Sequence, residues 1–128
     1  MNRVTLILTF LFSLMFSSPS YSEWTWASKS VGGTTYYVDY DRIRKVDGYV
    51  YWWDLTDYLK PKNGILSAKT YNQGDCKVFR YKFLSDSYYT LPMGQGTPST
   101  TSNEPDKEWH YPSPNSVNET ILKSVCSR

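Results

Sequence analysis

The chain has 128 residues, with 14 lysine and arginine residues against 12 aspartate and glutamate residues, which gives a formal net charge of +2 at pH 7. A nucleic-acid-binding protein is expected to show a concentrated basic excess, so this balance argues against a nucleic-acid partner. Aromatic residues make up 17% of the chain, which raises the question of whether some of them serve a surface rather than a core.

Residues 1–22 are predicted to be a secretory signal peptide. Arg3 gives a short basic start, residues 4–16 form an apolar run, and small serines follow. We expect cleavage before Glu23. The run is shorter than the roughly 20 apolar residues of a membrane-spanning helix, so no membrane span is expected.

Residues 23–128 are predicted to form a single exported domain. No cysteine lies directly after the apolar run, so we do not expect a lipoprotein anchor. The protein is therefore expected in the periplasm, at the cell surface or in the medium.

The first two thirds of this domain show short aromatic and β-branched runs separated by turn dipeptides. The dipeptides supply the positive φ that tight hairpins need, and they are Gly32-Gly33, Asp47-Gly48, Asn63-Gly64 and Gly74-Asp75. Strands are predicted near 24–30, 34–39, 48–59, 66–72 and 76–84, with a weak sixth near 88–93. Before the Asp-Gly reversal, Asp41 is expected to cap one helical turn.

Residues 92–115 hold five prolines and many small polar residues, which predicts a long loop. Loops of that length in a compact domain are usually functional, disordered or tethers. Trp109 and Tyr111 interrupt the polar sequence, so we expect an aromatic anchor to attach the second half of the loop to the sheet.

A helix is predicted from Val117 to Cys126, because apolar residues follow one helical stripe there. Ser116 and Glu119 have the spacing of a capping box at its start.

Cys76 and Cys126 are the two cysteines of an expected exported protein, and an oxidising compartment favours their pairing in a disulfide. The fold class is therefore α+β: an antiparallel meander of five to six strands and one C-terminal helix tethered to it by the disulfide.

The stretch from Tyr49 to Tyr58 sets two tryptophans side by side, and alternation in a strand points Trp52 and Trp53 to opposite faces. The row with Trp53 is expected to pair with the row that contains Phe79 and to form the core under the helix.

The less covered face is then predicted to carry the candidate binding residues Trp52, Tyr58, Arg80 and Lys82. One short helix cannot cover five strands, so aromatic surface remains exposed. Three interpretations of that surface stay open: the ordinary half-solvated face of a sheet, a surface for protein binding or self-association, and a site for a planar ligand.

Catalytic and metal-binding chemistry has little support. His110 is the single histidine, both cysteines are assigned to the disulfide, and no calcium-loop pattern is present. We therefore predict no enzyme activity and no metal site. Haem ligated by His110 stays open as an alternative.

Six ordered motifs resemble those of the surface-adhesin protein E family of bacterial exported domains. They are WTWASKSVGGTTYYVDYDRIRK, YVYWWDLTDYLKP, GDCKVFRYKFLS, PMGQG, the lone Trp109, and PSPNSVNETILKSVC. The similarity extends from Trp24 to Cys126. It implies a sheet of about six antiparallel strands, a C-terminal helix tied by a disulfide that matches Cys76 and Cys126, and the formation of dimers. It also implies adhesion to extracellular-matrix proteins, and haem binding is associated with the family's namesake.

The leading hypothesis is a non-catalytic exported binding module that uses the face with Trp52, Tyr58, Arg80 and Lys82 to hold a protein partner. The alternatives are a structural envelope protein that forms homodimers through its exposed sheet or edge strand, and a carrier of haem or another planar ligand.

Overall fold

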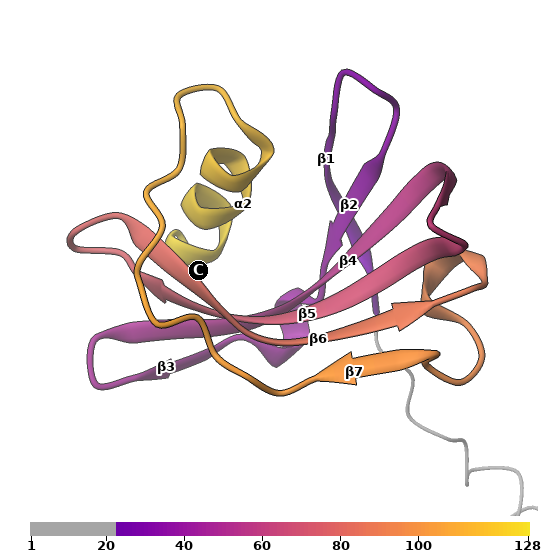
Figure 1. Ribbon diagram of the computed structural model, residues 1–128. Coiled ribbons are helices and arrows are strands. Elements are labelled where there is room, and N and C mark those ends of the chain that lie inside the picture. The colour runs from indigo at the N-terminus through magenta and orange to yellow at the C-terminus, as the bar shows by residue number, and fades with distance from the viewer. Residues whose placement is uncertain (1–22) are drawn as a thin grey trace, which may run out of the picture.

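One antiparallel sheet and one helix make up residues 23–128, which are the residues that this computed structural model describes. The strands, in the order in which they are hydrogen-bonded, are β1 (Thr25–Lys29), β2 (Thr35–Val38), β4 (Tyr49–Lys62), β5 (Ile65–Asp75), β6 (Arg80–Tyr89) and β7 (Thr100–Ser102). The short β3 (Arg44–Val46) pairs with the same edge of β4 as β2 does. Two 3-10 turns, η1 (Tyr40–Arg42) and η2 (Pro92–Gly94), and the helix α2 (Val117–Cys126) complete the fold (Figure 1). The predicted α+β class is confirmed, while the predicted signal peptide lies outside the described residues.

Two of the predicted hairpin turns form as their residues dictate. Asp47 and Gly48 join β3 to β4, and Asn63 and Gly64 join β4 to β5. All four have positive φ, between 51° and 84°, which is the conformation of a two-residue turn that matches the twist of the flanking strands. The Asp-Gly and Asn-Gly dipeptides therefore set where β4 begins and ends.

The strand boundaries after residue 72 differ from the prediction. Gly74 and Asp75 belong to β5 rather than to a turn, and the chain reverses over residues 76–79. The weak strand predicted near 88–93 is wrong, because β6 continues to Tyr89 and η2 follows. Asp39, not Asp41, caps η1, since its carboxylate accepts a hydrogen bond from the backbone N–H of Asp41 (3.2 Å).

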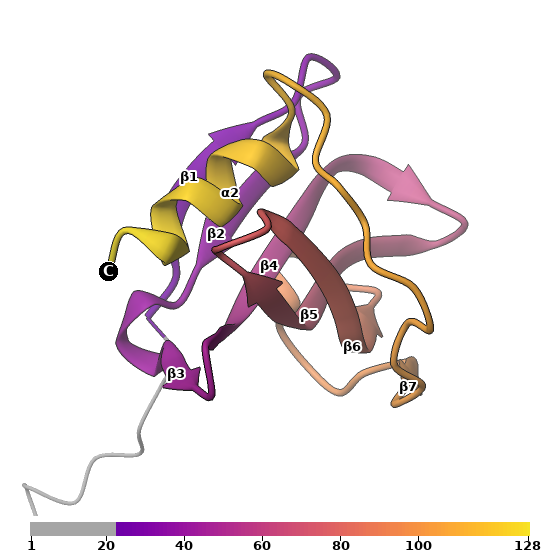
Figure 2. The same ribbon diagram turned by 90° about the vertical axis from the view of Figure 1, so that its left-hand side faces the viewer.

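Helix α2 has the predicted bounds and half of the predicted capping box. The Ser116 hydroxyl accepts a hydrogen bond from the backbone N–H of Glu119 (3.1 Å), but the Glu119 carboxylate accepts from the N–H of Asn115 (3.2 Å) instead of that of Ser116. Ile121, Leu122 and Val125 are buried. Figure 2 shows the helix lying along β1 and β2 on one face of the sheet.

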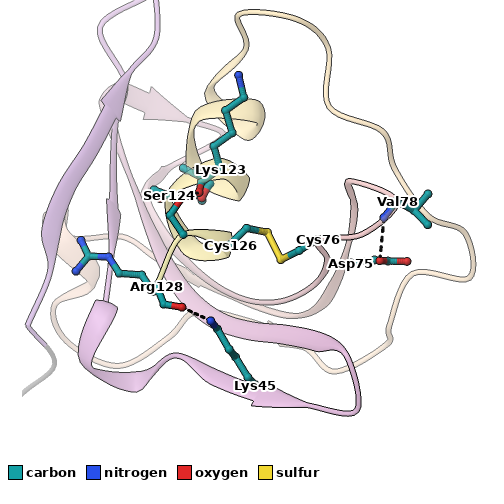
Figure 3. The surroundings of a disulfide bond; sticks show 10 residues. Lys45, Asp75, Cys76, Val78, Lys123, Ser124, Cys126 and Arg128 are labelled. Atoms are coloured by element: carbon teal, nitrogen blue, oxygen red, sulfur yellow. Dashed lines mark hydrogen bonds between the residues drawn. A yellow bond between two sulfur atoms is a disulfide. The ribbon is translucent and has the colours of Figure 1, made fainter.

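The disulfide between Cys76 and Cys126 joins the last turn of α2 to the reversal that follows β5 (Figure 3). The predicted pairing is confirmed. Nearby, the Lys45 ammonium group donates a hydrogen bond to the carbonyl oxygen of Arg128, and the Tyr40 hydroxyl donates to Ser124 (2.9 Å). The end of the helix is thus held to the sheet by a covalent bond and by polar contacts.

The core lies between α2 and the face of the sheet that carries Trp52, which we call the helix face. Its buried members are Val38, Val50, Trp52, Tyr81, Ile121, Leu122 and Val125. Gly74 lies at its centre, where an added Cβ would stand 2.8 Å from Trp52 and 2.9 Å from Leu122 and Val50. Trp52, Leu122 and Val50 thus fill the space that a side chain at position 74 would need. The expectation that the Trp53 row forms the core under the helix is wrong.

The segment from 103 to 115 forms an ordered strap along the outer edge of β6 (Figure 1). β7 pairs with residues 86–88 of β6, the backbone N–H of Asp106 donates to Phe83 (2.9 Å), and His110 exchanges two backbone hydrogen bonds with Tyr81 (2.8 and 2.9 Å). Together, β7 and the strap therefore cover the backbone groups of a strand that would otherwise be an exposed edge. Over residues 23–128, no helix is long and apolar enough to cross a membrane.

Candidate functional site

The four residues predicted to share one binding face lie in three different places. Trp52 is 2% exposed and packs under α2. Tyr58 lies on the same side of β4 but near Asp86, beyond the apolar core. Arg80 and Lys82 occupy the opposite face of the sheet. The prediction that the four residues share one face is therefore wrong, and only Arg80 and Lys82 lie on the same surface.

The pairing register of β4, β5 and β6 explains the correction. Val50 pairs with Gly74, and Gly74 pairs with Tyr81, so the row that contains Tyr81 belongs to the helix face. On the other face, Tyr49 aligns with Asp75 and Arg80. A shift of one residue between strands exchanges the faces of every side chain, and the composition of each strand does not specify that shift.

Arg80 and Lys82 contact an aromatic side chain that comes from the strap. The Cζ atom of Arg80 lies 4.4 Å from the ring centroid of Trp109, and the Nζ atom of Lys82 lies 4.8 Å from it. The ring of Tyr49 stacks against Trp109 with centroids 5.7 Å apart. Each cation over an aromatic face contributes about 0.5–1 kcal/mol at a partly exposed site. The expected aromatic anchor of the loop is therefore confirmed as Trp109.

A carboxylate fixes the orientation of Arg80. Its Nε atom lies 3.0 Å from Oδ2 of Asp75. The pKa of the Asp75 carboxyl is lowered, first by a hydrogen bond from the backbone N–H of Val78 (3.2 Å) and also by Arg80. Asp75 thus stays ionised and holds the guanidinium group against the tryptophan.

Further aromatic contacts continue from Tyr49 along the same face. The Tyr71 ring lies 6.1 Å from the ring of Tyr51 and 4.9 Å from that of Trp53, and Cζ of Arg42 lies 5.8 Å from the Trp53 centroid. We call this surface the aromatic–cationic ladder and define it by Arg42, Tyr49, Tyr51, Trp53, Tyr71, Arg80, Lys82 and Trp109. Only Arg80 and Lys82 of this set were predicted as binding residues. The row with Tyr49, Tyr51 and Trp53 was expected in the core, and Arg42, Tyr71 and Trp109 were not named as binding residues, although the lone tryptophan in a polar loop was a signal for Trp109.

His110 faces the other way from Trp109. Its Nε2 atom lies 2.8 Å from Oδ2 of Asp106, and its ring contacts those of Tyr81 and Phe83 at centroid distances of 5.5 and 5.8 Å. That nitrogen would have to give up its carboxylate partner before it could ligate a haem iron. Among residues 23–128, no group of three or more His, Cys, Asp and Glu side chains is arranged to hold a metal ion.

Comparison with known proteins supports the fold and the motifs. The profile of the surface-adhesin protein E family matches residues 24–127. The chain belongs to this family. Membership of a surface-adhesin family indicates an exported domain with binding partners and a non-catalytic role.

Solved structures of Haemophilus influenzae protein E share the fold. Crystal form II has a TM-score of 0.59 at 17% identity, over 85% of this chain and 91% of that one. The selenomethionine form has a TM-score of 0.60 at 17% identity, over 85% and 89% of the two chains. Protein E from a non-typeable strain has a TM-score of 0.54 at 17% identity, over 86% and 79%. Among curated protein sequences, none matches this chain.

Proposed function

We propose that this domain is an exported, non-catalytic binding module that holds a protein partner against the aromatic–cationic ladder. The observation that carries the proposal is the position of Trp109, which stacks on Tyr49 and has Arg80 and Lys82 across its ring. The strap and the sheet thereby form one surface of half-buried aromatic rings and cations.

The composition of the ladder is that of an interface centre. Tryptophan, tyrosine and arginine are enriched among the residues that contribute most to protein binding, because they bury a large area and keep a polar group at its edge. α2 lies on the opposite face of the sheet (Figure 2). The rings are also held in place before a partner arrives, which lowers the entropy that binding costs.

The test is binding of the purified, disulfide-bonded protein to immobilised extracellular-matrix proteins, the class of partner that the family resemblance implies. Arg80→Ala and Trp109→Ala are expected to weaken binding by about tenfold each, the usual effect of removing a central interface residue. Lys123→Ala is the matched control, because Lys123 is an exposed cation on α2, and it should leave binding unchanged. Folded ladder variants that bind like the unaltered protein would reject the ladder as the interface.

A second candidate function is self-association through β1. This strand is the edge of the sheet, and Trp26 on it is 57% exposed. An edge strand presents unpaired backbone groups that a second copy can extend. Sedimentation at micromolar concentration should then show a dimer that Trp26→Lys dissociates, whereas a monomer at that concentration excludes this function.

A further inference from the structure

The helix face continues beyond α2 and changes character there. Asp54 pairs with Thr70, and Thr70 pairs with Asp86, so these three side chains form one row across β4, β5 and β6. In the next row the same register aligns Tyr36 of β2 and Tyr88 of β6. Two carboxylates and several tyrosines therefore occupy the part of this face that the helix does not reach.

Both carboxylates are bonded to neutral donors. The Asn72 amide donates to Oδ2 of Asp54 (2.9 Å), and the Thr70 hydroxyl donates to Oδ1 of Asp86 (2.8 Å). A carboxylate taken out of water is paired with a cation or becomes protonated. Burial raises the pKa of Asp54 to about 7, and the charge of Asp86 adds to the increase. None of the salt bridges formed within residues 23–128 involves Asp54 or Asp86, so no protein cation is paired with either carboxylate.

A second group is directed at the same carboxylate. The indole N–H of Trp52 has no hydrogen-bond partner and is the one buried side-chain polar atom of the described residues in that condition. It lies near the Asp54 carboxyl without the geometry of a full hydrogen bond, and from there it lowers the pKa of that carboxyl against the effect of burial. This buried donor favours the ionised form of Asp54, which is the form that a cationic ligand needs.

Three tyrosines lie beside the carboxylates on this face and line two adjoining hollows. Burial, together with the charges of Asp54 and Asp86, raises the pKa of Tyr36, Tyr58 and Tyr88, so all three phenols stay neutral near neutral pH. Tyr36 and Tyr58 line a hollow of about 420 Å³, and Tyr58 and Tyr88 line another of about 300 Å³. Tyr58 belongs to both, so the two hollows form one site, which we call the acidic tyrosine hollow.

Two cations stand at the outer rim of this site. Lys60 and Lys62 line the larger hollow, and Lys62 also lines the smaller one. Both side chains are exposed. The site therefore has aromatic rings in its walls and ammonium groups at its opening, and the two carboxylates lie in the neighbouring row of the same face.

We propose that the acidic tyrosine hollow binds a zwitterion in which an organic ammonium group lies close to an anionic group. Tyrosine faces attract ammonium cations through the ring quadrupole, and desolvation strengthens that attraction. The two carboxylates add the charge that buried cations require, while Lys60 and Lys62 are placed to meet the anion. This site is separate from the ladder, which lies on the other face of the sheet.

Titration of the purified protein with choline tests the cationic half of the proposal, with 3,3-dimethyl-1-butanol as its uncharged isostere. Choline should give saturable shifts of backbone NMR signals in β2, β4 and β6, and the isostere should give none. Phosphocholine should bind about threefold more tightly than choline, the effect of added surface charge pairs. Equal shifts with choline and its isostere, weaker binding of phosphocholine than of choline, or the absence of saturable shifts would overturn the proposal.

Variants assign the effect to the named residues. Asp54→Asn and Tyr58→Ala should each weaken choline binding by about tenfold, and Lys62→Ala should remove the advantage of phosphocholine. Asp41→Asn is the control, because Asp41 is an exposed carboxylate in η1, and it should change nothing. Unaltered binding in folded Asp54→Asn and Tyr58→Ala proteins would contradict the assignment.

The affinity for choline should also depend on pH. The charged and titratable groups that line the hollow or lie beside it are Asp54 and Tyr58 of β4, Tyr36 of β2, Asp86 and Tyr88 of β6, and Lys60 and Lys62 at the rim. Asp54 is the one whose pKa lies near neutrality, so binding should strengthen between about pH 6 and about pH 8 as it ionises. The dependence should disappear in Asp54→Asn, and its persistence there would contradict the role of Asp54.

Phosphatidylcholine vesicles distinguish the source of the zwitterion. If the protein binds free phosphocholine and also co-sediments with vesicles, the ligand is a lipid headgroup. If it binds only the free compound, the ligand is a soluble zwitterion. Either result retains the chemistry of the proposal, because both require saturable binding of phosphocholine.

Discussion

The two ends of the helix face differ although the same strands build both. At one end Val50, Trp52 and Tyr81 pack against α2, and at the other end Asp54, Tyr58 and Asp86 lie beyond it. A helix of ten residues is about 15 Å long, so it shields only part of a sheet of this width. Strand alternation therefore assigns a side chain to a face, but the reach of the helix decides whether that position becomes core or site.

The largest difference in the free energy of unfolding is expected between variants of Trp52 and of Tyr58, two residues that the sequence pattern placed on one binding face. Trp52→Ala should lower the free energy of unfolding by about 4 kcal/mol, because it leaves a large cavity under the helix. Tyr58→Ala should cost less than about 1 kcal/mol, because the side chain is half exposed. Urea denaturation of both variants measures the difference, and equal losses would show that the helix covers both ends.

The disulfide holds the covered end in place. Cys126→Ser opens a loop closed by residues 50 positions apart, and loop entropy predicts a loss of up to about 4 kcal/mol. The melting temperature should fall by roughly 15–20 °C for a domain of this size. Cys76→Ser should give the same loss and the double variant no more, whereas an unchanged melting temperature in either would contradict the prediction.

Gly74 tests how tightly the covered end is packed. Gly74→Ala places a methyl group within 2.9 Å of Trp52, Leu122 and Val50, so the variant should lose about 2 kcal/mol through overpacking. Gly32→Ala is the matched control, since the nearest atom to its Cβ is the Ser30 hydroxyl at 4.0 Å, and it should be nearly neutral. If chemical denaturation gives similar stabilities for the two variants, the core is looser than described.

The pH dependence of stability tests whether Asp54 is buried at the end of the helix face that α2 does not cover. Its pKa is raised from 3.8 to about 7 in the folded protein, mainly by burial. The folded state therefore holds a proton that the unfolded state has lost, and the stability that this group contributes declines as pH rises from about 4 to about 7. Asp54→Asn lacks this decline and should be more stable than the unaltered protein by roughly 2 kcal/mol at about pH 8, with little difference at about pH 4.

Denaturation curves at several pH values give the measurement, and Asp41→Asn serves as the control. A difference between Asp54→Asn and the unaltered protein that stays constant across pH would show that Asp54 titrates normally. That outcome would place the carboxylate in open solvent and weaken the contrast between the two ends.

Local features were predictable from short stretches of sequence. The Asn63-Gly64 turn and the bounds of α2 follow from backbone preference and helical periodicity, which need only neighbouring residues. The pairing of two cysteines followed from the expected compartment. The role of Asp39 as the cap of η1 was missed because Asp41, two positions later, is an equally suitable residue type.

The candidate surfaces were only partly predictable. Arg80 and Lys82 were named as binding residues, and both belong to the aromatic–cationic ladder. Trp52 and Tyr58 were grouped with them because the alternating side chains of β4 were assigned to the wrong faces relative to those of β6. The signal that could have corrected this is Gly74, since a glycine within a strand often marks a close approach of neighbouring side chains.

By itself the sequence determined the elements of this protein: the turns, the helix, the family motifs and the two cysteines, because each depends on residues that are close along the chain. Tertiary structure alone decided which aromatic row became core, that Trp109 completes a surface with Tyr49, and that Asp54 and Asp86 lie beside three tyrosines on the helix face. These outcomes depend on strand register and on the length of sheet that α2 covers. Both are set by contacts between distant segments, and a strand that can slip by one residue carries no local record of which face it will present.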